Sequence, residues 1–264
     1  MSRSKDTWHK PPFISNPALR YGLYAAITIY VVLTLSTLPI DWERVSDGMN
    51  RAQRIFSGAF PPNFERSGLL IDGFLESLKI AILATVGGIA LSVPLAFMAA
   101  SNISVKPVYL LGRGIIIVAR SFHPVIVAII FVKAVGFGPL AGALTLVVYS
   151  IGFVAKLLAE RIEEIDFGQV EAMRSVGAGF IPTLAYAVVP QVMPRLVGLG
   201  IYQLDSNLRA SAVVGIVGAG GIGATLANAF GRYDYDFALA ITMVIVGVIL
   251  VSEAVSGFIR KRIA

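Results

Sequence analysis

The chain contains no cysteine, so it has neither a disulfide framework nor a thiolate metal site. Its two histidines, His9 and His123, are too few and too far apart in the sequence to hold a metal ion together. It also lacks the G-x-x-x-x-G-K-[ST] phosphate-binding loop and has no Gly-Lys dipeptide. We therefore expect no metal site and no cofactor in this chain, and any ATP-derived energy must come from another polypeptide.

Charge is also scarce. Only 14% of the 264 residues are charged and 56% are hydrophobic, whereas soluble domains carry about 25% charged residues. This composition indicates an all-α polytopic membrane protein, folded as one helical bundle in the lipid bilayer. We find no cluster of acids, histidines or a nucleophile with its base, so a membrane-embedded enzyme is not favoured. The small net charge of +6 does not suggest a nucleic-acid partner.

Six hydrophobic segments are long enough to cross the bilayer, with both chain ends in the cytoplasm because both are basic. The first 20 residues have no small-x-small cleavage signal after them, so they form a retained cytoplasmic tail. Residues 21–73 hold the first span and an external segment, and residues 74–260 hold the main bundle with a cytoplasmic loop at 160–190. The predicted spans are about 21–39, 74–100, 108–135, 140–158, 190–213 and 237–258.

Charged and helix-breaking residues affect three parts of this topology. The third span carries several basic residues, so its embedded part could begin near Arg120, with 108–119 lying partly along the cytoplasmic face. In the second span, Glu76 and Lys79 are three residues apart and can pair on one helical face. The uncharged windows 175–194 and 210–231 are not counted as spans, because prolines interrupt the first and glycines the second.

The external segment 41–73 has two possible structures. Val45, Met49, Ala52 and Phe56 recur at helical spacing with charged residues between them, which favours an amphipathic helix on the outer membrane surface. A solvated loop fits the same periodicity equally well.

No acidic residue occurs between residues 77 and 159, although six basic residues lie there. A charge at the centre of a helix in lipid costs about 2.5–3.5 kcal/mol, so such residues usually face an interior or reach the membrane edge. For Arg120, with His123 nearby, contact with a transported anion and snorkelling to the interface are equally supported. Arg113 is the weaker candidate for anion contact.

A second cationic candidate is Arg209. Asp205 lies four residues earlier on the same helical face, so an intrahelical ion pair is favoured over direct contact with a substrate. The pair would still hold a guanidinium inside the bundle, where an oxyanion could compete for it in bidentate geometry. Ser211 follows in the same stretch and completes the candidate substrate path.

Residues 215–223 contain five glycines and cannot form a stable helix interior. Gly218, Gly220 and Gly223 match the G-x-G-x-x-G dinucleotide fingerprint, but that motif requires a parallel sheet around it, which this composition does not support.

The segment 171–190, EAMRSVGAGFIPTLAYAVVP, is too broken to be a span. It predicts two short helices joined at Gly177, because glycine accepts the positive φ of a tight turn, and it ends at Pro190. Its pattern resembles the E-A-A, three residues, G, nine residues, I-x-L-P loop of permease subunits in binding-protein-dependent ABC importers. Glu171, Ala172, Gly177 and Pro190 match that pattern, and three positions differ from it: Met173, Ala187 and Val189.

This resemblance implies a type I importer permease in the bacterial inner membrane. The loop would be the coupling helix that seats in an ATPase, and Gly218, Gly220, Gly221 and Gly223 would form a gate near the outer face. The implied partners are a second copy of this chain, two ATP-binding subunits that hold ATP and Mg²⁺, and an extracytoplasmic binding protein.

The stretch 202–223, YQLDSNLRASAVVGIVGAGGIG, narrows the resemblance to phosphonate importer permeases, as do GFGPLAGAL and GFVAKLLAERIEEID before it. Where that family commonly has Glu, this chain has Asp205. The resemblance implies transport of a phosphonate- or phosphate-type oxyanion. A permease for another small solute, such as methionine, and an ATP-independent anion channel remain as alternatives.

Overall fold

The structure is a computed structural model that describes residues 14, 16–38 and 41–263, with side chains of the last helix as far as Ile259. Most of the predicted cytoplasmic tail, residues 1–20, and the basic side chains at the other end lie outside this description. Every regular element among the described residues is helical. The chain divides into two units, residues 1–54 and 55–264.

The first unit contains α1 (Pro17–Thr37) and most of α2 (Trp42–Ala59). Asn16 caps α1 by accepting a hydrogen bond from the Ala18 amide, and the apolar length of α1 suffices for a membrane span. Because α2 is helical throughout, the helical alternative for this part of 41–73 is confirmed and the loop alternative is wrong. The apolar residues Val45, Met49 and Phe56 are exposed along α2.

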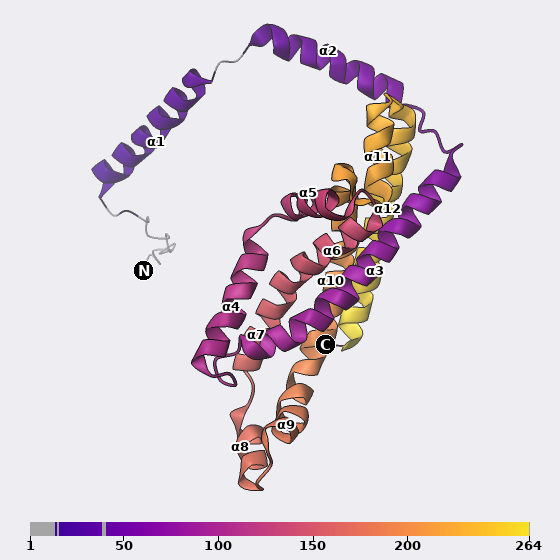
Figure 1. The fold of residues 1–264 in the computed structure, drawn as a ribbon. Helices are drawn as coiled ribbons and strands as arrows, with labels where there is room; N and C mark the ends of the chain where they lie inside the picture. Colours follow the sequence, from indigo (N-terminus) through magenta and orange to yellow (C-terminus); the bar gives the residue numbers. More distant parts are fainter. Residues whose placement is uncertain (1–13, 15, 39–40, 264) are drawn as a thin grey trace, which may run out of the picture. The chain divides into compact units, whose positions relative to one another are not determined.

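The second unit is a helical bundle (Figure 1). Three long helices lie side by side at its centre, namely α3 (Ser67–Met98), α6 (Pro139–Ser150) and α10 (Val189–Val214). The other elements are α4 (Lys106–Ser121), α5 (Pro124–Val135), α7 (Lys156–Glu163), α8 (Phe167–Ser175), α9 (Phe180–Thr183), α11 (Ile222–Gly231) and α12 (Tyr235–Ile263), and three π-helical turns, η1 (Ile151–Ala155), η2 (Leu184–Val188) and η3 (Gly215–Ala219).

Five helical runs are long and apolar enough to cross a membrane, and α4 with α5 makes a sixth if that bent pair counts as one span. These runs coincide with the six predicted spans. The π-turn η1 joins α6 and α7 into one 25-residue run, Pro139–Glu163. The glycines of 215–223 interrupt the helical structure as predicted, and a separate helix, α11, follows them.

The third span differs from the prediction. A 91° bend separates α4 from α5, and Arg120 lies at the end of α4 instead of at the start of an embedded helix. Residues 108–119 run alongside the bundle, since Arg113 contacts Glu163 while Arg120 lies beside Gly152 in the same long run. Residues 108–119 therefore form a helix packed lengthwise against this run, and their position relative to the cytoplasmic face stays a prediction. The break between α4 and α5 falls at His123–Pro124, because a residue before proline avoids the α region.

Two further expectations are wrong. The helix after Gly177 does not end at Pro190, because η2 continues it into one helical run from Phe180 to Ala219, although α10 (Val189–Val214) itself matches the fifth predicted span. Pro190 lies in the first turn of α10, directly after η2, where a missing backbone N–H is tolerated. Glu76 and Lys79 form no ion pair in the described structure, because Glu76 turns toward Gly220 while Lys79 is exposed.

The bundle has three apolar cores. The first joins the ends of α3 and α7 to Ile116 of α4, Val170 of α8 and Val192 of α10. The second joins the middle of α3 to α5, α6 and the glycine segment. The third holds α11 and α12 against the start of α3. The first and second cores therefore divide the long helices into two halves.

Candidate functional site

Within the loop 160–190, the two helices α8 and α9 are joined at Gly177, as predicted for the segment 171–190. After α8, the Gly177 amide donates to the Arg174 carbonyl (3.0 Å) and the Ala178 amide donates to the Met173 carbonyl (3.0 Å). These two bonds, with Gly177 at φ +80°, are a Schellman motif, in which a left-handed residue ends the helix. Glycine adopts this φ without a Cβ clash, so residue 177 sets the reversal between α8 and α9.

Asp166 and Gln191 hold this loop against the bundle. The Asp166 carboxylate caps α8 by accepting from the Gly168 amide (3.0 Å). The Gln191 side chain accepts from the Asp166 amide (2.8 Å) and donates to the Asp166 carbonyl (3.2 Å) and the Ala187 carbonyl (2.7 Å). A single side chain of α10 therefore fixes the start of α8, and sequence reasoning did not single out Gln191.

The outward face of the loop is apolar and accessible. Val176 is 78% exposed and Tyr186 73% exposed, with Phe180 and Ile181 also exposed. Glu171, Ala172 and Gly177 lie on the exposed surface of the loop, whereas Pro190 lies further along, at the start of α10. An apolar surface of this kind at the end of a bundle fits contact with another protein. Its contact with an ATPase stays a prediction.

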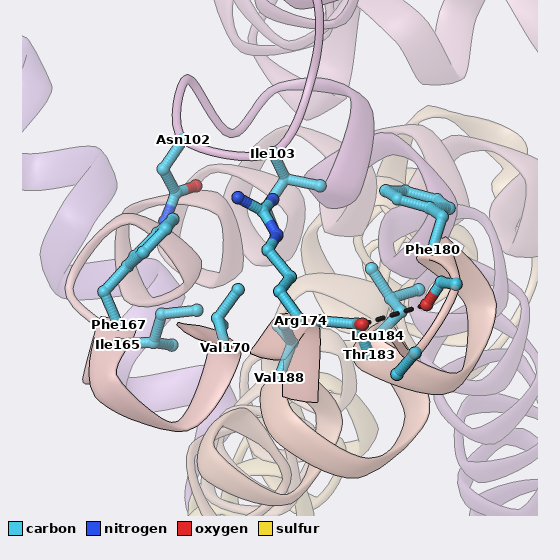
Figure 2. Close-up of a pocket in the computed structure, with 12 residues that line it drawn as sticks. Asn102, Ile103, Ile165, Phe167, Val170, Arg174, Phe180, Thr183, Leu184 and Val188 are labelled. Carbon is cyan, nitrogen blue, oxygen red and sulfur yellow. Dashed lines mark hydrogen bonds between the residues drawn. The ribbon is translucent and has the colours of Figure 1, made fainter. Parts of the chain in front are cut away.

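A cavity of about 200 Å³ lies behind this surface. Figure 2 shows Arg174 of α8 reaching across it toward Ile103, on the turn between α3 and α4. Phe167, Val170 and Phe180 supply apolar walls. The Thr183 hydroxyl donates to the Gly179 carbonyl (2.9 Å), which ties the start of α9 to its own first turn. The two loop helices thus enclose a small cavity beside the first core, to which Val170 and Val188 also belong.

Arg113 is part of the framework of this loop. Its guanidinium donates to the Glu163 carboxylate (2.8 Å) and to the Ala99 carbonyl (2.9 Å). Glu163 also accepts from the Ser101 amide (2.8 Å), and Asn102 donates to the Ile162 carbonyl (2.7 Å). With these partners Arg113 has a structural explanation, and sequence reasoning missed its pairing because Glu163 is 50 residues away.

Arg120 has no comparable partner: within the described part of the chain its side chain makes no ion pair or hydrogen bond. Its side chain and backbone lie against Gly152, where a Cβ would come within 2.7 Å of the Arg120 Cγ. Gly152 is near the middle of the run Pro139–Glu163. Arg120 therefore presents an exposed guanidinium at about the mid-depth of a predicted span.

His123 lies at the bend three residues further along. Its Nδ1 accepts from the Val125 amide (3.3 Å), so the imidazole caps α5. The side chain is exposed, as is that of Arg120 in the last turn of α4. The structure therefore places these two residues of the predicted substrate path at the same corner of the bundle.

Asp205 and Arg209 form the predicted intrahelical pair. The Arg209 guanidinium lies 2.6 Å from the Asp205 carboxylate, whose other oxygen accepts from the Ser252 hydroxyl of α12. The Asp205 side chain is 7% exposed, whereas the Arg209 side chain is 50% exposed and remains half accessible. Ser211 is buried and its hydroxyl donates to the Leu208 carbonyl (2.7 Å), which turns it toward its own helix.

A buried polar network at the centre of the bundle was not predicted. The Asn207 amide donates to Thr85 and to Ser150, both at 3.0 Å, and the Gln203 amide donates to Ser150 and to Asn207, also at 3.0 Å. Gln203, Asn207 and Ser150 have no exposed surface. The signal in the sequence is the pair of amides four residues apart, but it does not reveal the hydroxyls on α3 and α6.

The glycine segment reverses the chain at the other end of the bundle. Gly218, Gly220 and Gly221 have φ values of +94°, +80° and +74°. A Cβ on Gly223 would lie 1.9 Å from the Ala212 carbonyl oxygen, and one on Gly218 would lie 2.4 Å from the Phe137 ring. The Gly138 amide donates to the Gly218 carbonyl (3.1 Å). These glycines are therefore required by backbone geometry and by close approach.

An open hollow of about 670 Å³ adjoins this segment. Glu76, Phe137, Thr225 and Asn228 line it together with the glycine backbone. The Phe137 side chain is 84% exposed, the most exposed of the large hydrophobic residues in the described part of the chain. A polar hollow beside an exposed aromatic ring fits a site that another molecule covers.

Comparison with known proteins places this architecture in a family. The model described as "Binding-protein-dependent transport system inner membrane component" matches residues 92–264. The chain is 41% identical over 264 residues to the phosphate-import permease protein PhnE of Mycolicibacterium smegmatis, covering 96% of this chain and 48% of that protein. It is 37% identical over 246 residues to the phosphite transport system permease protein PtxC of Stutzerimonas stutzeri, covering 93% and 87% of the two chains.

Solved structures agree on the fold. The inward-facing methionine ABC transporter MetNI aligns with a TM-score of 0.66 and 21% identity over 76% of this chain and 99% of the solved chain. An amino acid ABC transporter aligns with a TM-score of 0.61 and 22% identity over 75% and 95% of the two chains. The chain spans about half the length of the mycobacterial relative. It belongs to the family of binding-protein-dependent transport system inner-membrane components, and it is a multi-pass permease subunit of an ABC importer with the type I permease fold.

Proposed function

We propose that the chain carries phosphonate-, phosphite- or phosphate-type oxyanions inward across the bacterial inner membrane. The relatives named for phosphate and phosphite transport support this substrate class. In the structure, the observation that carries the proposal is the exposed, unpaired Arg120 at mid-span within the described part of the chain. A cationic donor at that depth offsets the hydration that an oxyanion loses on leaving water.

Arg209 supplies a second cationic point on the proposed path. Asp205 fixes one edge of its guanidinium and leaves half of the side chain accessible, so a tetrahedral oxyanion can take the free edge. His123 lies at the bend beside Arg120, and because its Nδ1 accepts from the Val125 amide, its Nε2–H can donate to an anion. Ser211 has the weakest support, because its hydroxyl is buried and bonded to its own helix.

The exposure of Arg120 supports a homodimer. A lone arginine on a lipid-facing surface at mid-span costs about 2.5–3.5 kcal/mol, so we infer that a second copy covers this face and that the path runs between the copies. Two cytoplasmic ATPases, which hold ATP and Mg²⁺, would dock on Glu171, Ala172, Gly177 and the apolar surface around them. A binding protein would dock near the glycine segment and deliver the anion there.

The proposed topology places both termini in the cytoplasm. Residues 1–20 form the cytoplasmic tail, 21–73 hold the first span and the external amphipathic α2, and 74–260 form the permease core with the coupling loop at 160–190. The helical form of α2 and its exposed apolar residues support its place on the membrane surface. A cysteine placed near residue 180 should react with a membrane-impermeant reagent only from the cytoplasmic side.

Uptake into proteoliposomes tests the function. The chain is assembled with its ATPase and binding protein, and ATP-dependent accumulation of phosphate, phosphite and methylphosphonate is measured, with methionine as competitor. We expect accumulation that oxyanions inhibit and methionine does not. Accumulation without ATP would indicate a channel, and inhibition by methionine would indicate a different importer.

The path is tested in the same vesicles. Arg120→Ala and Arg209→Ala should each reduce uptake at low oxyanion concentration by at least about tenfold, the factor that 1.4 kcal/mol produces. Lys106→Ala is the matched control, since Lys106 is an exposed cation at the other end of α4. Normal uptake by both arginine variants would show that neither residue lines the path.

A further inference from the structure

The first and second cores are separated by a layer in which the helices are irregular. Four helical runs pass from one core to the other, and each contributes residues to both. In α3 the second core ends at Ala84 and the first begins at Leu95, with Pro94 immediately before it. In the α6–α7 run the second core ends at Leu146, and η1 forms the edge of the first core, since Ile151 packs against that core and Ala155 belongs to it.

The other two runs follow the same pattern. In α10 Val192 belongs to the first core and Leu196 packs against it, so Pro194 lies at the edge of that core, and the second core resumes at Val214. Ile116 of α4 belongs to the first core and Ala128 of α5 to the second, and the 91° bend separates them. Among the residues that the structure describes, all four connections between the two cores therefore contain a proline, a π-turn or a break.

Such interruptions weaken a helix locally. A proline removes one backbone hydrogen bond and crowds the preceding turn, and π-turns and breaks are where helices bend. One irregularity would mark a kink in one helix. Four along the edge of the first core that faces the second mark a level at which several helices can bend together.

The space between the two cores is polar. Thr85, Ser150, Gln203 and Asn207 all lie between core segments of their helices and are hydrogen-bonded to one another. Two buried atoms there, the Ser92 hydroxyl and the Gln203 carbonyl oxygen, have no hydrogen-bond partner. Hydrogen bonds between side chains can exchange partners as helices tilt, whereas interdigitated apolar side chains resist sliding.

We propose that this layer is a hinge inside each copy of the permease, and that its bending sets the position of Arg120. The first core, with Arg113 bonded to Glu163, makes α4 move together with the coupling loop. The bend at Phe122 and His123 releases α4 from α5. Arg120, at the end of α4 and against Gly152 of η1, therefore shifts relative to the glycine segment when an ATPase moves the loop.

The proposal rests on the proposed partnership with an ATPase, and distances measured inside one copy test it. Because the chain has no cysteine, introduced cysteines are its only thiols. Spin labels attached in place of Lys106 and Lys133, both exposed, give a distance that crosses the layer. Labels at Lys106 and Met193, both on the side of the first core, report within one half. Labelled chains are diluted with unlabelled ones and assembled with the ATPase and binding protein.

We expect the Lys106–Lys133 distance to change by several ångströms between the nucleotide-free and ATP-trapped complex, while the Lys106–Met193 distance stays constant. If uptake proceeds and neither distance changes, each copy moves as one rigid body and the hinge is disproved. If both distances change alike, the boundary lies elsewhere and the proposal is equally wrong. Failure of oxyanion uptake with an intact distance change would overturn the substrate proposal alone.

Proline variants supply a second test. Pro94→Ala and Pro194→Ala restore backbone donors inside α3 and α10, so they should reduce the distance change and lower uptake severalfold while ATPase binding persists. Pro107→Ala is the matched control, because Pro107 lies in the first turn of α4, where no backbone bond is lost. An uptake loss that is equal in all three variants would count against the hinge.

Discussion

Arg113 and Glu163 bond the first half of α4 to the last turn of α7 through a 2.8 Å ion pair between residues 50 positions apart. Both side chains are about three-quarters buried, with 23% and 26% exposure. The pair therefore joins α4 to α7, the helix that leads into the coupling loop.

Arg113→Gln should lower the free energy of unfolding by about 1.5–3 kcal/mol, the usual range for a hydrogen bond to a charged group. Arg161→Gln is the control, because the Arg161–Glu164 pair is long (3.6 Å), exposed and worth about 0–1 kcal/mol. Thermal unfolding in detergent measures both. Equal shifts in the two variants would mean that the Arg113 pair adds nothing to the fold.

The buried network predicts a difference between two threonines. Thr85 and Thr242 each donate to the carbonyl four residues earlier, at 2.7 and 2.8 Å, but only Thr85 also accepts from Asn207. Thr85→Val should therefore destabilise the protein by about 1–3 kcal/mol, since it leaves a buried amide donor short of a partner. Thr242→Val, on α12, should be nearly neutral. A similar loss in both variants would remove the network as an explanation of stability.

The glycine at the turn between α8 and α9 predicts another contrast. Gly177 has φ +80°, while Gly179 has φ −70° and only the Pro182 ring within 4.0 Å of an added Cβ. Gly177→Ala should cost about 1–2 kcal/mol, because the left-handed conformation crowds a Cβ, and it should weaken ATPase binding. Gly179→Ala should have little effect. Affinity of the detergent-solubilised permease for its ATPase is the measurement, and unchanged affinity in Gly177→Ala would place the docking surface elsewhere.

At the opposite end, Gly218→Ala should impair transport strongly. The substitution combines a φ of +94° with a Cβ 2.4 Å from the Phe137 ring, so the turn must open or the ring must move. Gly231→Ala is the control, because no atom lies within 4 Å of its added Cβ. Adding Phe137→Ala to Gly218→Ala removes the clash and should restore part of the uptake. No restoration would show that backbone strain alone impairs transport.

Local patterns in the sequence predict most of the fold. Long apolar runs located the spans, a glycine between two short helical patterns located the turn at Gly177, and five glycines in nine residues located the reversal after α10. The Asp205–Arg209 pair was also predictable, because its partners are one helical turn apart. Each of these features is decided by residues within about one or two turns of one another.

Features that depend on distant residues were not predictable. Helical continuity across Pro190 depends on η2 and on packing against the first core, which a proline count does not reveal. Glu76 turns to a glycine segment more than 140 residues away instead of to Lys79. The direction of α4 depends on Glu163, and the central network on side chains from three helices. In each of these cases, contacts with residues distant in the sequence determine the structure.

Gly152 has a consequence for how anion handling could diverge among related permeases. Its missing Cβ leaves room for the stem of Arg120, and the two residues come from different helices. A methyl group at position 152 would displace the guanidinium without touching any solute. Affinity for the transported ion could thus drift through a residue that never meets it, and comparison of side chains in direct contact with the ion would miss the change.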